Sequence, residues 1–306
     1  MRIEEKDRYL ASDGDAAKKS DIAVGPMKTM RDGWHNLALR QRRIMLIPSQ
    51  SSIPGLKAAI IVVLVAILGT YLVALSIDGE RLDQLSWEDG LIEDLGAVFF
   101  LAATIGFAVV SLFAAAGAPL SAAPDKRRAL VFGLLAVLMF VCLGEEISWG
   151  QRIFDWSTPE SISELNAQNE TNIHNIWFVH QWNRDGTEKG FVGKLLNMNR
   201  LFSAFWLIVF VFIPIAARLS ARARRLFRTS EIPVPPLWAG GLFLGSFVVN
   251  KVLGTMYAGS IQAHALDEIK ESIYAFIYAF IAIVSLVWAV RYRPEETDSH
   301  LECRGS

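Results

Sequence analysis

Carboxylate and imidazole side chains gather in four segments of the sequence, residues 87–94, 144–152, 166–175 and 264–271. Proteins use these two groups for general acid–base catalysis and for binding Zn²⁺, Mn²⁺ or Fe²⁺. The sequence has no zincin motif and no pair of closely spaced cysteines, so no single motif specifies a metal. The prediction of a divalent metal site therefore depends on the four segments meeting in space.

Seven residues of these segments are the predicted metal ligands. They are acidic or histidine side chains expected at one face of a membrane: Glu93, Glu145, Glu146, Glu170, His174, His264 and Glu268. Glu145 and Glu146 are also predicted catalytic residues, as ligands or as general acid and base. Arg152 completes the predicted catalytic set, because its guanidinium could hold an anionic headgroup or an essential carboxylate.

The adjacent pair Glu145 and Glu146 is the strongest of these signals. The uncharged run 129–144 rises about 24 Å at about 1.5 Å per residue, less than the roughly 30 Å of a hydrocarbon core. Both carboxylates then lie near the bilayer edge, at a helix C-terminus where the dipole disfavours anions. Ionised groups there must be paired, protonated or bound to a cation. An internal ion pair with Arg152, without any chemistry, is the structural alternative.

Other acidic residues have structural explanations that compete with a functional one. Near expected helix N-termini the dipole favours a carboxylate by about 0.3–1 kcal/mol, which applies to Glu88, Asp89, Asp267 and Glu268. Glu93 lies one turn deeper than Asp89 on the same helical face. His264 shares a helical face with the acids three, four and seven residues later. Glu170 and His174 would also share a face if their segment is helical.

Six apolar runs must position these residues. The 306-residue chain is 52% hydrophobic and only 20% charged, with a mean hydropathy of +0.32, which excludes disorder for most of the chain. Each run approaches or exceeds the roughly 20 residues that a helix needs to cross a bilayer. The runs are 56–77, 91–116, 129–149, 201–217 (extending naturally to 198–219), 237–257 and 273–290. The predicted fold class is all-α, a polytopic membrane protein with a bundle of about six transmembrane helices.

Basic residues alternate between the loops, and this alternation predicts the orientation. They cluster before the first span, between the second and third, between the fourth and fifth, and after the sixth. Cytoplasmic loops carry such an excess, so both termini are predicted to be cytoplasmic. The chain then divides into a cytoplasmic arm 1–55, a transmembrane domain 56–292 with an outer cap 157–197, and a cytoplasmic tail 293–306. The basic amphipathic segment 34–47 of the arm suits a helix on an anionic membrane surface or a partly ordered arm.

The net charge of the chain and a pattern of small residues indicate which partners the protein could have. The net charge of −1, from 30 basic and 31 acidic residues, predicts no nucleic-acid partner. Membrane lipids and a lipid-linked substrate are the predicted partners. The GxxxG pattern from Gly241 to Gly245 permits close helix contact, which leaves a homo- or hetero-oligomer through the membrane helices open. Lys251, in the outer half of the same span, either snorkels outward or counters the acidic cluster from within the bundle.

Two strings of the sequence are fairly specific. They are Gly-Glu-Glu-Ile-Ser-Trp-Gly-Gln-Arg at 144–152 and Asn-Ala-Gln-Asn-Glu-Thr-Asn-Ile-His-Asn at 166–175. They resemble strings in a widespread set of bacterial polytopic membrane proteins without an assigned activity, which also carry an acidic Glu-Asp-Gly stretch before their second span. The resemblance covers roughly residues 56–292. It implies a protein of the bacterial plasma (inner) membrane, and it implies no activity.

Two classes of function follow from these observations. The leading hypothesis is a membrane-embedded enzyme at the outer leaflet, metal-assisted, acting on a lipid or lipid-linked substrate. The rival is a non-catalytic module, either an accessory subunit of a larger membrane complex or an ion or proton pathway. Spans two and six are almost wholly apolar below Glu93 and Glu271, which counts against a pathway. The classes differ in whether the polar clusters converge on a common point.

Overall fold

The computed structural model describes residues 53–87, 90–117, 124–180, 183–230 and 232–291, without the side chain of Arg152. The basic segment of the predicted arm, the predicted tail, Glu88 and Asp89 lie outside the described residues. Within the described ranges the regular elements are helices, accompanied by one isolated antiparallel bridge between Asn166 and Ile176. The predicted all-helical fold class is therefore confirmed for this part of the chain.

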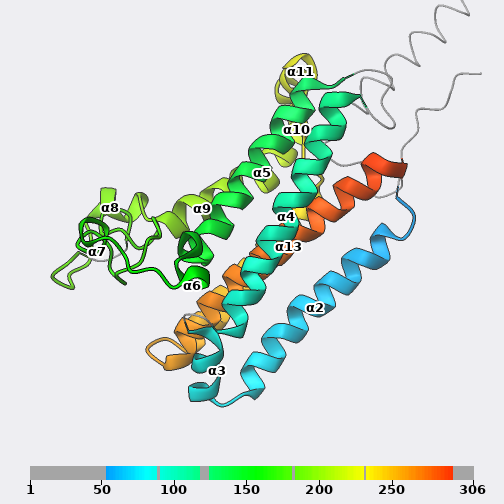
Figure 1. Ribbon diagram of the computed structural model, residues 1–306. Coiled ribbons are helices and arrows are strands. Elements are labelled where there is room, and N and C mark those ends of the chain that lie inside the picture. Colours follow the sequence, from blue (N-terminus) through cyan, green and yellow to red (C-terminus); the bar gives the residue numbers. More distant parts are fainter. Residues whose placement is uncertain (1–52, 88–89, 118–123, 181–182, 231, 292–306) are drawn as a thin grey trace, which may run out of the picture. The chain divides into compact units, whose positions relative to one another are not determined.

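Six helical stretches of the described chain are long and apolar enough to cross a membrane, as the sequence predicted. They are α2 (Leu56–Ser76), α4 (Leu91–Ala116), α5 (Lys126–Glu146), the stretch Met198–Leu219, α12 (Leu237–Met256) and α13 (Ile261–Arg291). Helix α4 packs along α5 on one side and along α13 on the other (Figure 1). Helix α12 also packs on α13. Helix α3 (Gly79–Ser86) precedes α4 and contacts the N-terminal part of α13.

Helices α5 and α13 differ from the predicted spans at the ends that carry candidate site residues. Helix α5 ends at Glu146 and does not continue to residue 149, because Ser148 and Trp149 take left-handed backbone conformations. Helix α13 begins at Ile261 and not at residue 273. The polar face that starts at His264 is therefore one continuous helix with the membrane span.

A cluster of aromatic side chains fixes α13 against its neighbours. Trp206 and Phe243 stack with ring centroids 5.5 Å apart, and Phe243 lies 4.9 Å from Tyr278. Each of these side chains is at most 2% exposed. Buried aromatic pairs stabilise a contact beyond the area that they bury, so the cluster holds α13 and its polar N-terminal face in place.

The fourth span contains a π-helical turn and a proline, and one of its carbonyl groups lies against a neighbouring helix. It consists of α9 (Met198–Trp206), the π-helical turn Leu207–Phe212 and α10 (Ile213–Leu219). Pro214 has no N–H to donate to the carbonyl of Phe210 four residues earlier. Gly240 of α12 lies against that carbonyl, and an added β-carbon there would be 2.1 Å from the Phe210 oxygen. The close approach of the two helices therefore requires glycine at position 240.

The close contact predicted for the GxxxG pattern does not occur at its two glycines. Gly241 and Gly245 are exposed on α12, and nothing in the described chain lies within 4 Å of an added β-carbon at either position. The glycine that α12 uses for packing is Gly240, one residue before the pattern. An oligomer formed through the membrane helices stays a prediction.

Replacing Gly240 by alanine should destabilise the bundle by about 1–3 kcal/mol, because the added methyl group forces α12 away from the fourth span. Gly241→Ala is the matched control, since its methyl group enters open space and alanine favours a helix. Thermal unfolding of both variants in detergent measures the difference. Equal melting temperatures for the two variants would contradict the packing.

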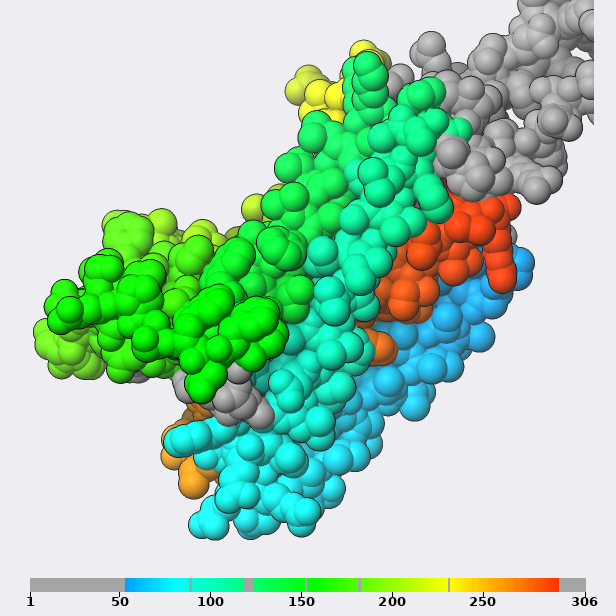
Figure 2. Space-filling model, in the orientation of Figure 1, coloured from blue at the N-terminus to red at the C-terminus, as the bar shows by residue number. Residues whose placement is uncertain are grey.

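The chain between α5 and α9 forms a cap at one end of α5. Its described residues include a 3-10 turn at Ser148–Gly150 and the short helices α6 (Gln151–Phe154), α7 (Glu160–Ser163) and α8 (Phe191–Leu195). Figure 2 shows the cap, in green, as a lobe beside the membrane helices. The other end of α5 begins with Lys126, Arg127 and Arg128, so the cap and this basic end lie at opposite ends of the same helix.

Candidate functional site

Helix α5 ends in a sharp reversal of the backbone. Ser148, Trp149 and Gly150 all have positive φ values, of 45°, 55° and 90°. A left-handed conformation costs a non-glycine residue about 1–3 kcal/mol, so it persists only where neighbouring contacts hold it. The reversal turns the indole of Trp149 back onto Gly144, where an added β-carbon would lie 2.9 Å from the ring. Position 144 therefore requires a glycine.

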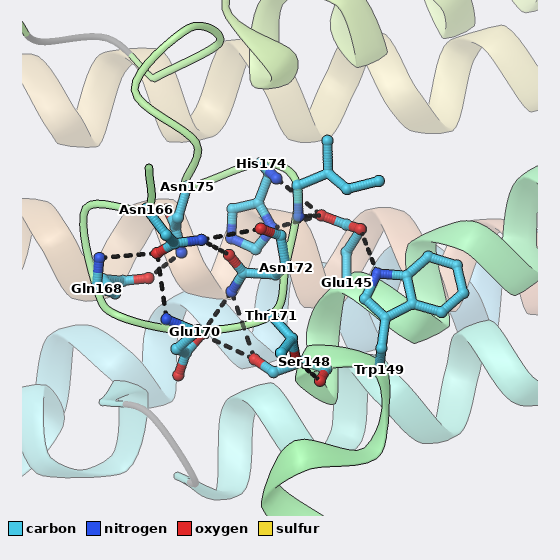
Figure 3. A network of polar contacts seen from close by, with 11 residues as sticks. Glu145, Ser148, Trp149, Asn166, Gln168, Glu170, Thr171, Asn172, His174 and Asn175 are labelled. Carbon is cyan, nitrogen blue, oxygen red and sulfur yellow. Dashed lines mark hydrogen bonds and ion pairs between the residues drawn. The ribbon is translucent and has the colours of Figure 1, made fainter. Parts of the chain in front are cut away.

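The Glu145 carboxylate accepts hydrogen bonds on both of its oxygens (Figure 3). Oε1 accepts from the indole Nε1 of Trp149 at 2.7 Å. Oε2 accepts from the backbone amides of Ile173 and His174 at 2.7 and 2.8 Å, and lies 3.1 Å from Nδ1 of His174. The side chain of Glu145 is only 13% exposed. These donors compensate for its position at the disfavoured end of a helix, and they join α5 to the cap.

Segment 166–175 is held by hydrogen bonds among its own polar side chains and with the α5 reversal. Asn166 accepts from the backbone amides two and four residues later, and it donates to Asn172. Glu170 accepts from the Ser148 hydroxyl at 2.8 Å and from the side-chain amide of Asn172 (Figure 3). Asn166, Glu170 and Asn172 are all buried. Because buried polar groups are costly unless they are bonded, this network gives the segment one defined shape.

The helical spacings that the sequence suggested for this region do not apply. Segment 166–175 is not helical, so Glu170 and His174 do not share a helix face, and they bond to Ser148 and Glu145 respectively. Because α5 ends at Glu146, Arg152 does not follow Glu145 on the same helix. The side chain of Arg152 lies outside the described residues, and its predicted role stays a prediction.

A second group of titratable side chains lies where α13 meets α3 and α4. Nδ1 of His264 is 4.0 Å from Oδ1 of Asp83, and its Nε2 is 3.9 Å from Oε1 of Glu268. Glu268 also lies within electrostatic range of Glu93 and Glu271. Three predicted ligands, one of them on α4 and two on α13, therefore occupy this region.

Lys270 supplies a positive charge on the acidic face of α13. The sequence analysis considered Lys251 for this role. Its Nζ lies 3.0 Å from Oδ1 of Asp267 and 3.9 Å from Oε1 of Glu271. Asn199 of α9 donates a hydrogen bond to Glu271 at 3.0 Å. Lys251 is exposed, in agreement with a side chain that snorkels outward.

The described contacts of the predicted ligands form two groups, and Cys142 lies within electrostatic range of Glu145 and Glu146 of the first group and of Glu271 beside the second. Glu145, Glu170 and His174 lie where α5 meets the cap, together with the half-buried Glu146 at the end of α5. The other group is the one around His264. Over the described ranges, no three or more His, Cys, Asp or Glu side chains are arranged so that they could hold a metal ion. The divalent metal stays a prediction, and the pair Glu145 and His174 would need a third ligand.

The contact between Glu145 and His174 can orient the imidazole for proton transfer. A carboxylate accepts hydrogen bonds and does not donate them, so a neutral His174 carries its proton on Nδ1 and leaves Nε2 as an acceptor. The His174 side chain is 36% exposed, so part of the imidazole is accessible to another molecule. An imidazole oriented by a carboxylate can take a proton from water or from a hydroxyl group.

The comparisons with known proteins add no family to this description. The chain matches no protein-family model, no curated protein and no solved structure. The likeness of strings 144–152 and 166–175 to bacterial membrane proteins stays a resemblance. Function is therefore inferred from the residues at the junction of α5 and the cap.

Proposed function

We propose that the protein is a membrane enzyme that acts at the outer face on a lipid or lipid-linked substrate. His174 is the general base, and Glu145 is its positioning residue. The contact of 3.1 Å between Nδ1 of His174 and Oε2 of Glu145 carries this proposal. The backbone amides that also bond to Glu145 support it, because they fix the carboxylate before it orients the imidazole.

The distribution of basic residues supports the proposed orientation, with the cap outside and both termini cytoplasmic. Basic residues begin α5 at the end away from the cap. Helix α11 (Ala221–Ser230) carries four arginines and no acidic residue, and Arg127 donates a hydrogen bond to the Ser230 carbonyl at 2.6 Å. An excess of arginine and lysine is typical of the cytoplasmic side. The bacterial plasma membrane is the location that we propose.

An accessory subunit without catalytic activity is the second candidate. The completeness of the hydrogen-bond network in segment 166–175 favours it, because a rigid polar surface also suits the docking of another subunit. The two candidates differ in what the Nε2 atom of His174 does. A docking surface tolerates the replacement of a proton acceptor by an amide, whereas a general base does not.

The metal-assisted form of the proposal needs a third ligand beside Glu145 and His174, which no His, Cys, Asp or Glu of the described residues supplies in the present arrangement. It predicts that purified protein retains zinc, manganese or iron, and that the Glu145→Gln, Glu146→Gln double variant loses the metal. Elemental analysis of both preparations tests this form. A wild-type protein without a stoichiometric metal would contradict the metal-assisted form. Acid–base catalysis by His174 without a metal would then be the form of the proposal that stands.

Proteoliposomes made from bacterial lipid extract test the function itself. Purified protein is incubated in them, and mass spectrometry follows every lipid class over time. The proposal predicts that one class is depleted as a product appears, at a rate proportional to the amount of protein. If no lipid class changes relative to protein-free liposomes, the enzyme proposal is contradicted and the accessory role is favoured.

A further inference from the structure

The cap contains an open cavity of about 520 Å³ that is not part of the junction with α5. Its walls combine the aromatic residues Trp177 and Phe178, the aliphatic residues Val192 and Leu196, and the basic residues Arg184 and Lys189. No acidic residue lines it. A cavity with apolar walls and two cations fits a ligand that is both anionic and apolar.

Both cations keep donors for a ligand. Nζ of Lys189 donates to the backbone carbonyls of Trp177 and Phe178, which leaves one of its three hydrogens and its whole charge uncompensated. Gly193 permits this arrangement, because an added β-carbon would lie 2.7 Å from Cδ of Lys189. The guanidinium of Arg184 pairs with no carboxylate of the described chain.

The acidic residues next to the cavity are already paired elsewhere. Asp185 accepts hydrogen bonds from the hydroxyl and the backbone amide of Thr187, and these bonds lower the pKa of its carboxyl group. Glu188 forms an ion pair with Lys194, whose hydrogen bond lowers the pKa of that carboxyl group. The described contacts of these two carboxylates do not include Arg184 or Lys189, so the positive charge of the cavity is available to an anion.

Large apolar side chains beside the cavity are exposed to the surroundings. Phe178 is 69% exposed, Phe191 78% and Val192 67%, and Leu195 on α8 is 53% exposed. Water-soluble surfaces rarely gather such side chains in one place. Aromatic and aliphatic groups next to cations are typical of the interfacial region of a membrane, where lipid chains can cover them.

We infer that this cavity binds the phosphate headgroup of an anionic phospholipid, with the acyl chains along the exposed residues of α8. Arg184 and Lys189 contact the phosphate, and Phe191 and Val192 contact the chains. Inorganic phosphate would satisfy the cations but not the apolar side chains, which is why we assign the cavity to a lipid. The inference rests on the proposed function, since it names the class of lipid that the cap brings to His174.

Retention of lipid by the full-length protein tests the inference. The protein is exchanged into mixed micelles with equal amounts of phosphatidylglycerol and phosphatidylcholine, and native mass spectrometry counts the lipids that remain bound. The wild type should retain phosphatidylglycerol in preference. Arg184→Gln should weaken that retention about tenfold, the effect of losing one charge-assisted hydrogen bond. Arg200→Gln is the matched control, because it removes the same charge from an exposed residue that does not line the cavity.

Three outcomes would overturn the inference. They are equal retention of the two lipids, equal retention by Arg184→Gln and the wild type, and displacement of the lipid by millimolar inorganic phosphate. A His174→Gln variant separates this inference from the proposed enzyme function, because it should bind phosphatidylglycerol as the wild type does. Selective binding of phosphatidylglycerol without any lipid conversion would contradict the proposed enzyme function and support the lipid-binding cavity. Lipid conversion without selective binding would support the enzyme function and contradict the cavity.

Discussion

Replacing His174 by glutamine is expected to lower the rate of lipid conversion by about 10²–10⁴-fold, the usual contribution of a general base. Glutamine can still donate a hydrogen bond to Oε2 of Glu145, which also keeps its bonds from Trp149 and from the two backbone amides. The cap should therefore keep its structure while the proton acceptor is lost. The proteoliposome assay measures the rate.

His180→Gln is the matched control for that variant. It makes the same substitution in the same cap, but the His180 ring lies against Trp177, with ring centroids 5.5 Å apart. We expect it to keep most of the wild-type rate. An equal loss of rate in the two variants would indicate a general disturbance of the cap. An unchanged rate in His174→Gln would show that His174 is not the general base.

Replacing Glu145 by alanine is expected to release the cap from α5. The variant loses the acceptor for Trp149, for the His174 ring and for two backbone amides. Leaving such partly buried donors unsatisfied costs about 2–4 kcal/mol of local stability. Since each 1.4 kcal/mol is a factor of about ten, the amides of Ile173 and His174 should exchange with solvent at least about 30-fold faster.

Hydrogen exchange followed by mass spectrometry measures this effect, with Glu164→Ala as the control. Glu164 is an exposed acidic residue of the same cap, so its loss should leave exchange in segment 166–175 unchanged. Protection that persists in Glu145→Ala would show that the carboxylate does not hold the cap. The Glu145→Gln variant should lie between, because its amide oxygen still accepts a hydrogen bond.

The membrane helices could be predicted closely from the sequence, since their apolar runs have clear ends. The bounds of α4 coincide with the predicted span 91–116, and α12 ends one residue before the predicted span does. The start of α13 was missed as part of a span, because its first turns carry acidic residues and a lysine that interrupt the apolar run. Their spacing on one helical face nevertheless predicted a helix there.

The sequence predicted that Glu145 has bonding partners, but it did not predict which groups they are. The expected place of Glu145 at a helix end near the bilayer edge predicted that the carboxylate needs partners. The sequence could not show that two of these partners are the backbone amides of Ile173 and His174, because backbone groups have no sequence signature. Trp149 was also missed as a partner, since its bond depends on a left-handed backbone conformation that tryptophan rarely adopts.

The convergence of all four polar segments on one point stays a prediction, and the described contacts form two groups. Segment 166–175 folds onto the end of α5, where Ser148 and Glu145 bond to it, and the polar face of α13 bonds to α9 and lies beside α3. Hydrogen bonds within segment 166–175 decided the first arrangement. Loop networks of this kind depend on the exact backbone path, which spacing along the chain does not determine.

The position of the proton on the His174 ring shows whether Glu145 orients this imidazole as a general base requires. Protein labelled with ¹⁵N-histidine in lipid bilayers gives separate ring-nitrogen signals, and the signals of His174 are those that His174→Gln lacks. We predict that neutral His174 carries its proton on Nδ1, with Nε2 free, and that Glu145→Ala abolishes this preference. A proton on Nε2 in the wild type, or the same signals in Glu145→Ala, would contradict the account.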